Sequence, residues 1–104
     1  MVVELLYFAD CPSWERALEN LEKAMRLEGV SVPVQRVLVP SVEDAERYRF
    51  LGSPTVRIDG VDLEGPDADE RPSMFGCRLY REEGQAKGWP SIAVIQSALQ
   101  RAQG

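Results

Sequence analysis

The sequence has no histidine, and this absence excludes more kinds of site than any other feature of its composition. A serine or cysteine nucleophile paired with a histidine base is impossible, and so is a metal site built from imidazole ligands. Two cysteines in 104 residues are also too few for a disulfide framework or a tetrahedral zinc site. We therefore expect no bound metal and no other cofactor, and the cysteines serve either packing or chemistry.

Long apolar runs and an excess of positive charge are lacking as well. No stretch approaches the ~18 apolar residues that cross a bilayer, and Met1 leads directly into the segment VVELLYF with no basic region before it. The 17 acidic and 12 basic side chains give a net charge of -5, which repels phosphate backbones and anionic lipids. We expect a cytoplasmic protein that binds neither nucleic acid nor membranes, and its oligomeric state stays open.

Apolar residues make up 44% of the chain, which is enough for one hydrophobic core, whereas two domains would each be too small. We expect a single domain over residues 1–104. Residues 2–8 are nearly all apolar, which predicts a strand covered on both faces. From Pro12 onward apolar residues recur at helical spacing, and Gly29 is expected to end this helix.

Three further elements are predicted in the first half of the chain. Residues 30–39 alternate as a strand, and Pro33 cannot donate a ladder hydrogen bond, so this strand should lie at a sheet edge. Ser41 with an acid three residues later resembles a capping box, and residues 42–51 predict a short helix that a glycine ends. Residues 54–60 predict a third, brief strand closed by an Asp-Gly turn.

The second half is predicted to be less regular. Residues 61–76 hold five acids, two prolines and two glycines, which predicts one long solvated loop without an ordered cation site. Residues 77–80 should form a fourth strand, 81–88 a turn, and 89–103 a closing helix with Pro90 near its first position. The residues of this helix expected to face the core are Ile92, Ile95, Leu99 and Ala102. The predicted order is β-α-β-α-β-β-α, an α/β fold whose right-handed first crossover makes the first two strands parallel.

Cys11 stands where the first predicted strand meets the first predicted helix, in the segment FADCPSW. Amides in the first turn of a helix have no partner and carry about half a positive charge, so a thiolate is favoured there. The carboxylate of Asp10 opposes this effect, and we expect the helix dipole to prevail narrowly. The alternative for Cys11 is a small buried hydrophobic residue at a tight junction.

Several segments resemble proteins of the thioredoxin-like superfamily, over nearly the whole chain. FADCPSW follows a buried strand, GSPT at residues 52–55 opens the third strand, and a hairpin and a terminal helix follow. The resemblance implies a four-stranded mixed sheet ordered two-one-three-four and flanked by three helices. It implies that Cys11 is the nucleophile, that Pro54 beside it is cis, and that the backbone of Ser53 pairs with an extended substrate. The substrate-binding residues implied in this way are Pro12, Trp14, Ser53 and Pro54.

The chain departs from thioredoxin itself at Trp14, where a second cysteine would complete a Cys-x-x-Cys pair. This departure excludes release of a mixed disulfide by a neighbouring thiol, so the local chemistry is that of a single thiol, as in glutaredoxin-like proteins. Cys11 would form a mixed disulfide, or be oxidised by peroxide to a sulfenic acid that an outside thiol restores. Ser13 would donate a hydrogen bond to the sulfur. Trp14 also begins the apolar face of the helix, and core packing is its favoured role.

The chain resembles, more narrowly, a bacterial group of small thioredoxin-like proteins. The shared motifs are D-[CU]-P-S-W, G-S-P-T-V-x-[IV]-D-G and C-R-x-Y, which correspond here to residues 10–14, 52–60 and 77–80. Some members carry selenocysteine at the position of Cys11, which implies that a reactive chalcogen is required there. Members of the group are sometimes labelled alkylmercury lyase-like.

The sequence therefore predicts a thiol-dependent redox protein, either a monothiol oxidoreductase or a thiol peroxidase-like enzyme, with glutathione or a protein thiol or disulfide as its partner. Cys11 is the predicted nucleophile. Cys77 is the only internal thiol available to resolve it, but the family topology places Cys77 at the opposite end of the sheet, and packing is its favoured role. Two alternatives stay open, namely soft metals such as mercury or copper(I) bound by both sulfurs, and a non-catalytic interaction module.

Overall fold

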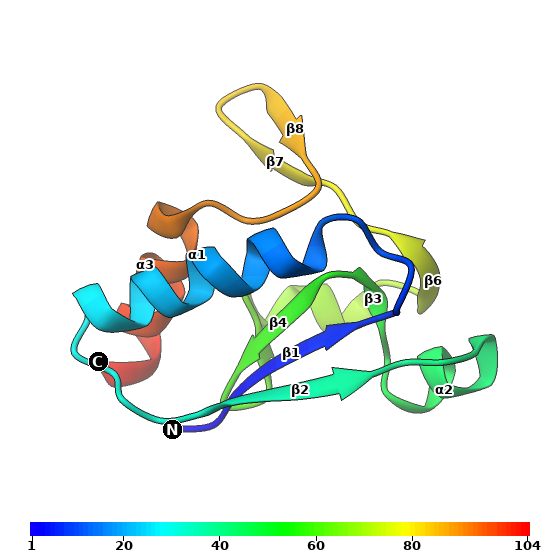
Figure 1. Ribbon diagram of the computed structural model, residues 1–104, viewed down its shortest axis with the longest axis horizontal. Helices are drawn as coiled ribbons and strands as arrows, with labels where there is room; N and C mark the ends of the chain where they lie inside the picture. Colours follow the sequence, from blue (N-terminus) through cyan, green and yellow to red (C-terminus); the bar gives the residue numbers. More distant parts are fainter.

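The computed structural model describes residues 1–104 as an α/β fold with three α-helices and a mixed four-stranded sheet (Figure 1). The sheet consists of β1 (Val3–Tyr7), β2 (Val34–Leu38), β4 (Thr55–Ile58) and β5 (Val61–Asp62), in the order β2-β1-β4-β5. β1 runs parallel to β2 and antiparallel to β4, and Leu5 is paired with Arg36 on one side and Val56 on the other. β2 lies at an edge and begins directly after Pro33, which confirms the prediction from the missing donor.

One face of the sheet is covered by α1 (Trp14–Leu27) and α3 (Ile92–Gln103), which lie side by side in Figure 1. The main core cluster fills the space between the sheet and these helices and consists of Val3, Leu5, Ala17, Leu21, Ala24, Met25, Val56, Ile58, Leu63, Tyr80, Ile95, Ala98 and Leu99. A fully buried leucine such as Leu21 contributes about 1.5–3 kcal/mol. This packing fixes α1 on the sheet and thereby fixes the segment that precedes it.

The opposite face has a smaller core beside α2 (Val42–Arg47), which follows β2 in Figure 1. Its four buried members are Leu6, Val39, Ala45 and Phe50. Leu5 belongs to the main cluster and its neighbour Leu6 to the smaller one, because successive side chains of a strand point to opposite faces. β1 is therefore covered on both faces, as its nearly continuous apolar sequence predicts.

The predicted ends of the first two helices are confirmed in part. Gly29 follows α1 with a φ of 69°, the left-handed conformation that suits a glycine at a helix end. Ser41 caps α2 by accepting a hydrogen bond from the amide of Asp44 at 3.2 Å. The predicted extent of α2 to residue 51 is wrong, because Arg49 takes a φ of 53° and turns the chain into a further strand, β3 (Leu51–Ser53).

The predicted element order is wrong in its second half. Residues 61–76 are not one solvated loop but contain β5, the 3-10 helix η1 (Pro66–Glu70) and most of β6 (Met74–Cys77). Asp62 and Leu63 are each 2% exposed, so this acidic segment is partly buried. The acidic composition wrongly predicts a solvated segment, because the carboxylate of Asp62 is buried together with an ion-pair partner, Arg78, that lies far away in the sequence.

The predicted fourth strand at residues 77–80 is also wrong, because β5 is the fourth strand of the main sheet. β6 instead pairs in parallel with β3, as a separate two-stranded unit. Residues 81–88, predicted as a turn, largely belong to a hairpin of β7 (Tyr80–Glu82) and β8 (Gln85–Lys87), which projects from the body of the molecule (Figure 1).

The closing helix begins slightly later than predicted. Ser91 is its N-cap and accepts a hydrogen bond from the amide of Val94 at 3.2 Å, so Pro90 lies before the cap rather than in the first turn. Ile95 and Leu99 are fully buried as predicted, and Ile92 is partly buried. Ala102 is exposed, contrary to the prediction, because it lies in the last turn and borders a surface hollow.

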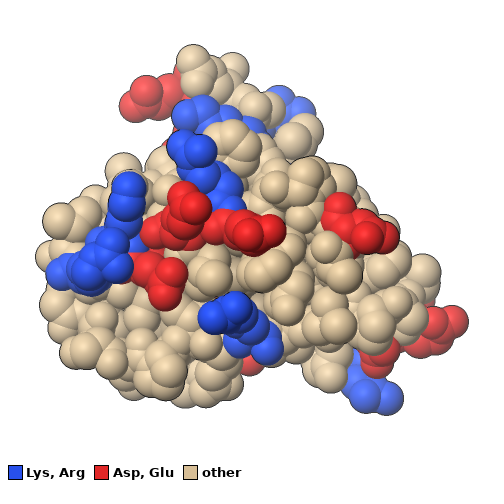
Figure 2. Space-filling model, viewed as in Figure 1, with Lys and Arg blue, Asp and Glu red and all other residues tan.

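None of the helices combines the length and apolarity that crossing a bilayer requires. On the face shown in Figure 2, acidic and basic side chains lie close to one another, so neither sign of charge dominates that face.

Candidate functional site

Cys11 lies in the tight turn that joins β1 to α1. Its amide donates a hydrogen bond to the carbonyl oxygen of Phe8 at 3.1 Å, which closes a four-residue turn directly after the strand. The side chain is 5% exposed, yet it belongs to neither of the two hydrophobic clusters. Cys11 is therefore buried just beyond the end of β1 and outside the two hydrophobic clusters.

The helix begins slightly beyond the thiol. α1 starts at Trp14 with Ser13 as its N-cap, so Cys11 lies two residues before the cap and not in the first turn. No side chain caps this helix, and the amides of residues 14–16 make no hydrogen bond within the chain. These free donors are the positive end of the helix dipole and remain available to a negative charge nearby.

The residues that follow Cys11 match their predicted roles only in part. Ser13 makes no hydrogen bond to the sulfur, because its hydroxyl lies against Gly88, where a Cβ atom would be 2.5 Å from the Ser13 Oγ. Trp14 stacks on Tyr7 with ring centroids 4.4 Å apart and packs against the main cluster, which confirms core packing. Pro12 is exposed.

Ser53 and Pro54 lie beside the turn that holds Cys11. The hydroxyl oxygen of Ser53 accepts a hydrogen bond from the amide of Phe8 at 3.3 Å, and the Ser53–Pro54 peptide bond is cis. Both residues are buried. The expectation that the backbone of Ser53 stays free for a substrate is wrong for its carbonyl oxygen, which accepts a hydrogen bond from the amide of Arg78 at 3.0 Å.

The predicted position of Cys77, at the opposite end of the sheet from Cys11, is wrong. β6 runs parallel to β3, and the register pairs Cys77 with Ser53. On the same strand, the ring of Phe75 lies 5.4 Å from the ring of Phe8, which borders the Cys11 turn. Figure 1 shows β6, β3 and the segment after β1 together at one end of the molecule. Cys77 is exposed, and both cysteines are free thiols.

An apolar hollow of about 300 Å³ opens next to the Cys11 turn. The residues that line it are Phe8, Ala9, Asp10, Leu38, Val39, Pro40 and Phe75. Asp10 contributes the only charged side chain, and the two phenylalanines form one wall. The hollow can accept an apolar group next to the segment that carries the thiol.

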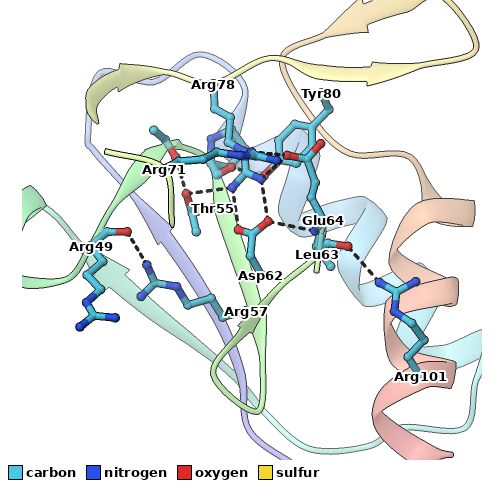
Figure 3. A network of polar contacts seen from close by, with 12 residues as sticks. Arg49, Thr55, Arg57, Asp62, Leu63, Glu64, Arg71, Arg78, Tyr80 and Arg101 are labelled. Carbon is cyan, nitrogen blue, oxygen red and sulfur yellow. Dashed lines mark hydrogen bonds and ion pairs between the residues drawn. The ribbon is translucent and has the colours of Figure 1, made fainter. Parts of the chain in front are cut away.

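A buried ion-pair network holds the segment that follows Cys77 (Figure 3). The guanidinium of Arg78 donates to both carboxylate oxygens of Asp62 at 2.7 Å, and to Glu64 at 2.8 Å. It also lies 4.5 Å from the centroid of the Tyr80 ring, whose hydroxyl donates to the carbonyl oxygen of Pro54. The network therefore ties β5, the end of β6 and the start of β7 to the backbone beside the thiols.

The burial of this network changes the acidity of its members. Burial alone would lower the pKa of Arg78, but hydrogen bonds to Asp62 and Glu64 outweigh it and raise the pKa. Partial burial would raise the pKa of Glu64, but hydrogen bonds from Arg71 and Arg78 hold it below the ordinary value. Burial raises the pKa of Tyr80, and the charge of Arg78 offsets this only in part.

Tyr80 is expected to make the protein less stable at high pH. Since its pKa is raised in the folded state, the unfolded chain releases this proton first, near the ordinary pKa of about 10. The stabilising contribution is complete below that pH and is lost as the pH rises further, by up to about 1.4 kcal/mol per pH unit. Urea unfolding at a series of alkaline pH values should show a steeper loss of stability for the natural protein than for Tyr80→Phe. Parallel curves would contradict this expectation.

The sequence analysis missed Asp62, Glu64 and Arg78 as members of the site. The residues themselves carry little signal, because acids in a Gly- and Pro-rich stretch are usually solvated. Arg78 and Tyr80 do alternate after Cys77, a spacing that places both side chains on one face of an extended chain. That spacing does not identify the acidic partners, which lie 14 and 16 residues earlier.

No group of three or more Cys, Asp or Glu side chains is arranged to hold a metal ion. The features near Cys11 are thus two thiols, a buried serine hydroxyl, the free amides of a helix and an apolar hollow. Comparison of the chain with protein-family models, curated proteins and solved structures gives no match.

Proposed function

We propose that the protein is a thioredoxin-like, thiol-dependent redox protein in which Cys11 is the nucleophile. Cys11 attacks an oxidised substrate, either a peroxide or a disulfide, and an external thiol such as glutathione or a protein thiol later restores it. Two features support the thioredoxin-like assignment: the sheet order β2-β1-β4-β5, and the position of Pro54 immediately before β4.

The position of Cys11 between β1 and the uncapped end of α1 carries the proposal. Thiolates are stabilised by nearby amide donors and by the positive end of a helix, and here those amides have no other partner in the chain. Asp10 is exposed and does not cap the helix, so its carboxylate leaves these amides free.

The burial of Cys11 favours small oxidants over large ones. With 5% of its surface exposed, the thiol is more accessible to a peroxide than to a folded protein partner. The apolar hollow beside the turn gives an organic hydroperoxide or an apolar peptide side chain a place to bind. The proposal therefore favours peroxidase-like chemistry, with disulfide exchange as a slower reaction of the same sulfur.

The proposal is tested on the Cys77→Ser variant, in which Cys11 is the only thiol. Brief exposure to peroxide at neutral pH in the presence of dimedone should convert Cys11 to a sulfenic acid and then to the dimedone adduct, detected by peptide mass spectrometry. The Cys11→Ser variant, which retains Cys77, should give far less adduct. An adduct on Cys11 that forms only in urea would overturn the proposal, because an inert buried thiol reacts only after unfolding.

Binding of a soft metal is a second candidate, favoured by the pairing of Cys77 with Ser53 beside the Cys11 turn. Mercury(II) and copper(I) accept two sulfur ligands, so such a site needs both cysteines. Loss of either cysteine would abolish tight binding of mercury(II), whereas the redox proposal requires only Cys11 for the first oxidation. Comparison of the two single-cysteine variants thus separates the two functions.

A further inference from the structure

We propose that Cys77 is the resolving thiol for Cys11, so that the protein completes an internal two-cysteine cycle in place of the missing Cys-x-x-Cys pair. This inference rests on the proposed function of Cys11. It concerns the second step, in which the oxidised sulfur is released, and assigns that step to a residue 66 positions later in the sequence.

The register of β6 on β3 is the first observation. Cys77 is paired with Ser53, and the amide of Arg78 donates to the carbonyl oxygen of Ser53 at 3.0 Å. Paired residues of neighbouring strands direct their side chains to the same face. The register shifts between Leu51 and Ser53 but still pairs Ser53 with Cys77, and the hydroxyl of Ser53 is directed to the amide of Phe8, so the backbone at Cys77 lies near the end of β1.

The connection from Ser53 to Cys11 is the second observation. Ser53 binds the amide of Phe8, and the carbonyl oxygen of Phe8 binds the amide of Cys11. The rings of Phe75, on β6, and Phe8, directly after β1, are also in contact, which joins the same two segments a second time. Ser53 therefore links the backbone of the Cys11 turn to the backbone at Cys77.

The contact between β3 and β6 is the third observation. β6 is the only strand paired with β3, and Ser53 with Cys77 is one of the two pairs in its register. The Arg78 network holds the residue after Cys77, so the approach of the two sulfurs must come from the Cys77 side chain and the Cys11 turn.

The reaction balances with a peroxide as the oxidant. The Cys11 thiolate attacks one oxygen of the peroxide, so that the S–O bond forms as the O–O bond breaks. The other oxygen leaves as hydroxide or alkoxide and is protonated to water or an alcohol, and the sulfur becomes a sulfenic acid, oxidised by two electrons. Cys77 then attacks this sulfur, the S–S bond forms, and the S–O bond breaks. The leaving hydroxide takes the proton of the Cys77 thiol and departs as water. Two equivalents of an external thiol then return two electrons, restore both cysteines and leave as their own disulfide.

The solvent exposure of the two cysteines suits a cycle in which Cys11 is oxidised first and Cys77 resolves it. Cys11 is covered, which protects its sulfenic acid from further oxidation, whereas Cys77 is exposed. A reductant can reach the disulfide through the Cys77 sulfur without access to the Cys11 turn. Since Cys77 is exposed, its replacement by serine leaves both cores intact.

The test oxidises the natural protein and Cys77→Ser with one equivalent of peroxide and maps the products by mass spectrometry. The natural protein should yield the Cys11–Cys77 disulfide with near-complete loss of the dimedone adduct, whereas Cys77→Ser should retain the adduct on Cys11. The double variant Cys77→Ser/Ser73→Cys is a matched control. It keeps two thiols but moves the second to an exposed position before β6, so it should behave like Cys77→Ser.

Two results would overturn the inference, and they are distinguishable. If Cys11 forms equal amounts of adduct with and without Cys77, and no Cys11–Cys77 peptide is found, Cys77 does not resolve it and the proposed function of Cys11 still stands. If Cys11 stays unreacted in both proteins, the proposed function fails and the inference fails with it.

Discussion

Replacement of Arg78 by methionine should lower the free energy of unfolding by about 3–5 kcal/mol. Arg78 and Asp62 are 4% and 2% exposed, and the change leaves the carboxylate of Asp62 buried without its counter-ion. It also removes the cation that lies over the Tyr80 ring and the ion pair that fixes the segment after Cys77. Urea unfolding at neutral pH measures the loss, which is a large part of the stability of a domain of this size.

Arg71→Met is the matched control for this change. Arg71 also pairs with Glu64, but the two side chains are 49% and 29% exposed, so its loss should cost about 1 kcal/mol or less. The double variant Arg78→Met/Asp62→Leu should recover part of the stability lost by Arg78→Met, because no unpaired charge remains buried. Equal losses for Arg78→Met and Arg71→Met would show that burial does not govern this network.

Replacement of Gly52 by alanine should cost about 2–5 kcal/mol, the sum of backbone strain and steric overlap. Gly52 has a φ of 102°, a conformation that residues with a side chain rarely adopt. Its Cβ atom would lie 2.5 Å from the Met74 Cε and 3.0 Å from the Arg78 Cβ. The methionine end can move, but the Arg78 Cβ is held by the ion-pair network, so β6 must separate from β3.

Gly84→Ala separates the two causes. Gly84 has a φ of 80° but no atom within 4 Å of the added Cβ, so this change should show the backbone strain alone, about 1–2 kcal/mol. If Cys77 resolves Cys11, Gly52→Ala should also reduce formation of the Cys11–Cys77 disulfide, whereas Gly84→Ala should leave it unchanged. Similar stability and similar disulfide yields in the two variants would contradict the role assigned to the β3–β6 contact.

The first half of the fold could be predicted from the sequence because its signals are local. The apolar run of β1, the helical spacing of α1 and the missing donor of Pro33 each act within a few residues, and each predicts an element that the structure contains. The position of Cys11 at the strand-to-helix junction follows from the same signals. Its distance from the helix cap does not, because Pro12 and Ser13 form a turn of their own.

The second half could not be predicted, because it depends on partners far apart in the chain. The sequence around Asp62 is that of a solvated acid, and only its buried pairing with Arg78 shows otherwise. For the same reason residues 61–76 have the composition of a loop, although they contain β5, η1 and most of β6. The pairing of Cys77 with Ser53 depends in turn on a parallel contact between β3 and β6. Parallel pairing brings together segments that are not adjacent in sequence, so no local sequence pattern predicts which strands will pair.

The sequence by itself determined that the site contains no histidine and no metal bound by imidazole. It also determined that one thiol lies at the end of a buried strand and that the second strand lies at an edge of the sheet. These properties follow from residue types and their immediate neighbours. Only the tertiary structure decided that Cys77 lies at the same end as Cys11, because the burial of Arg78 against Asp62 directs β6 alongside Ser53.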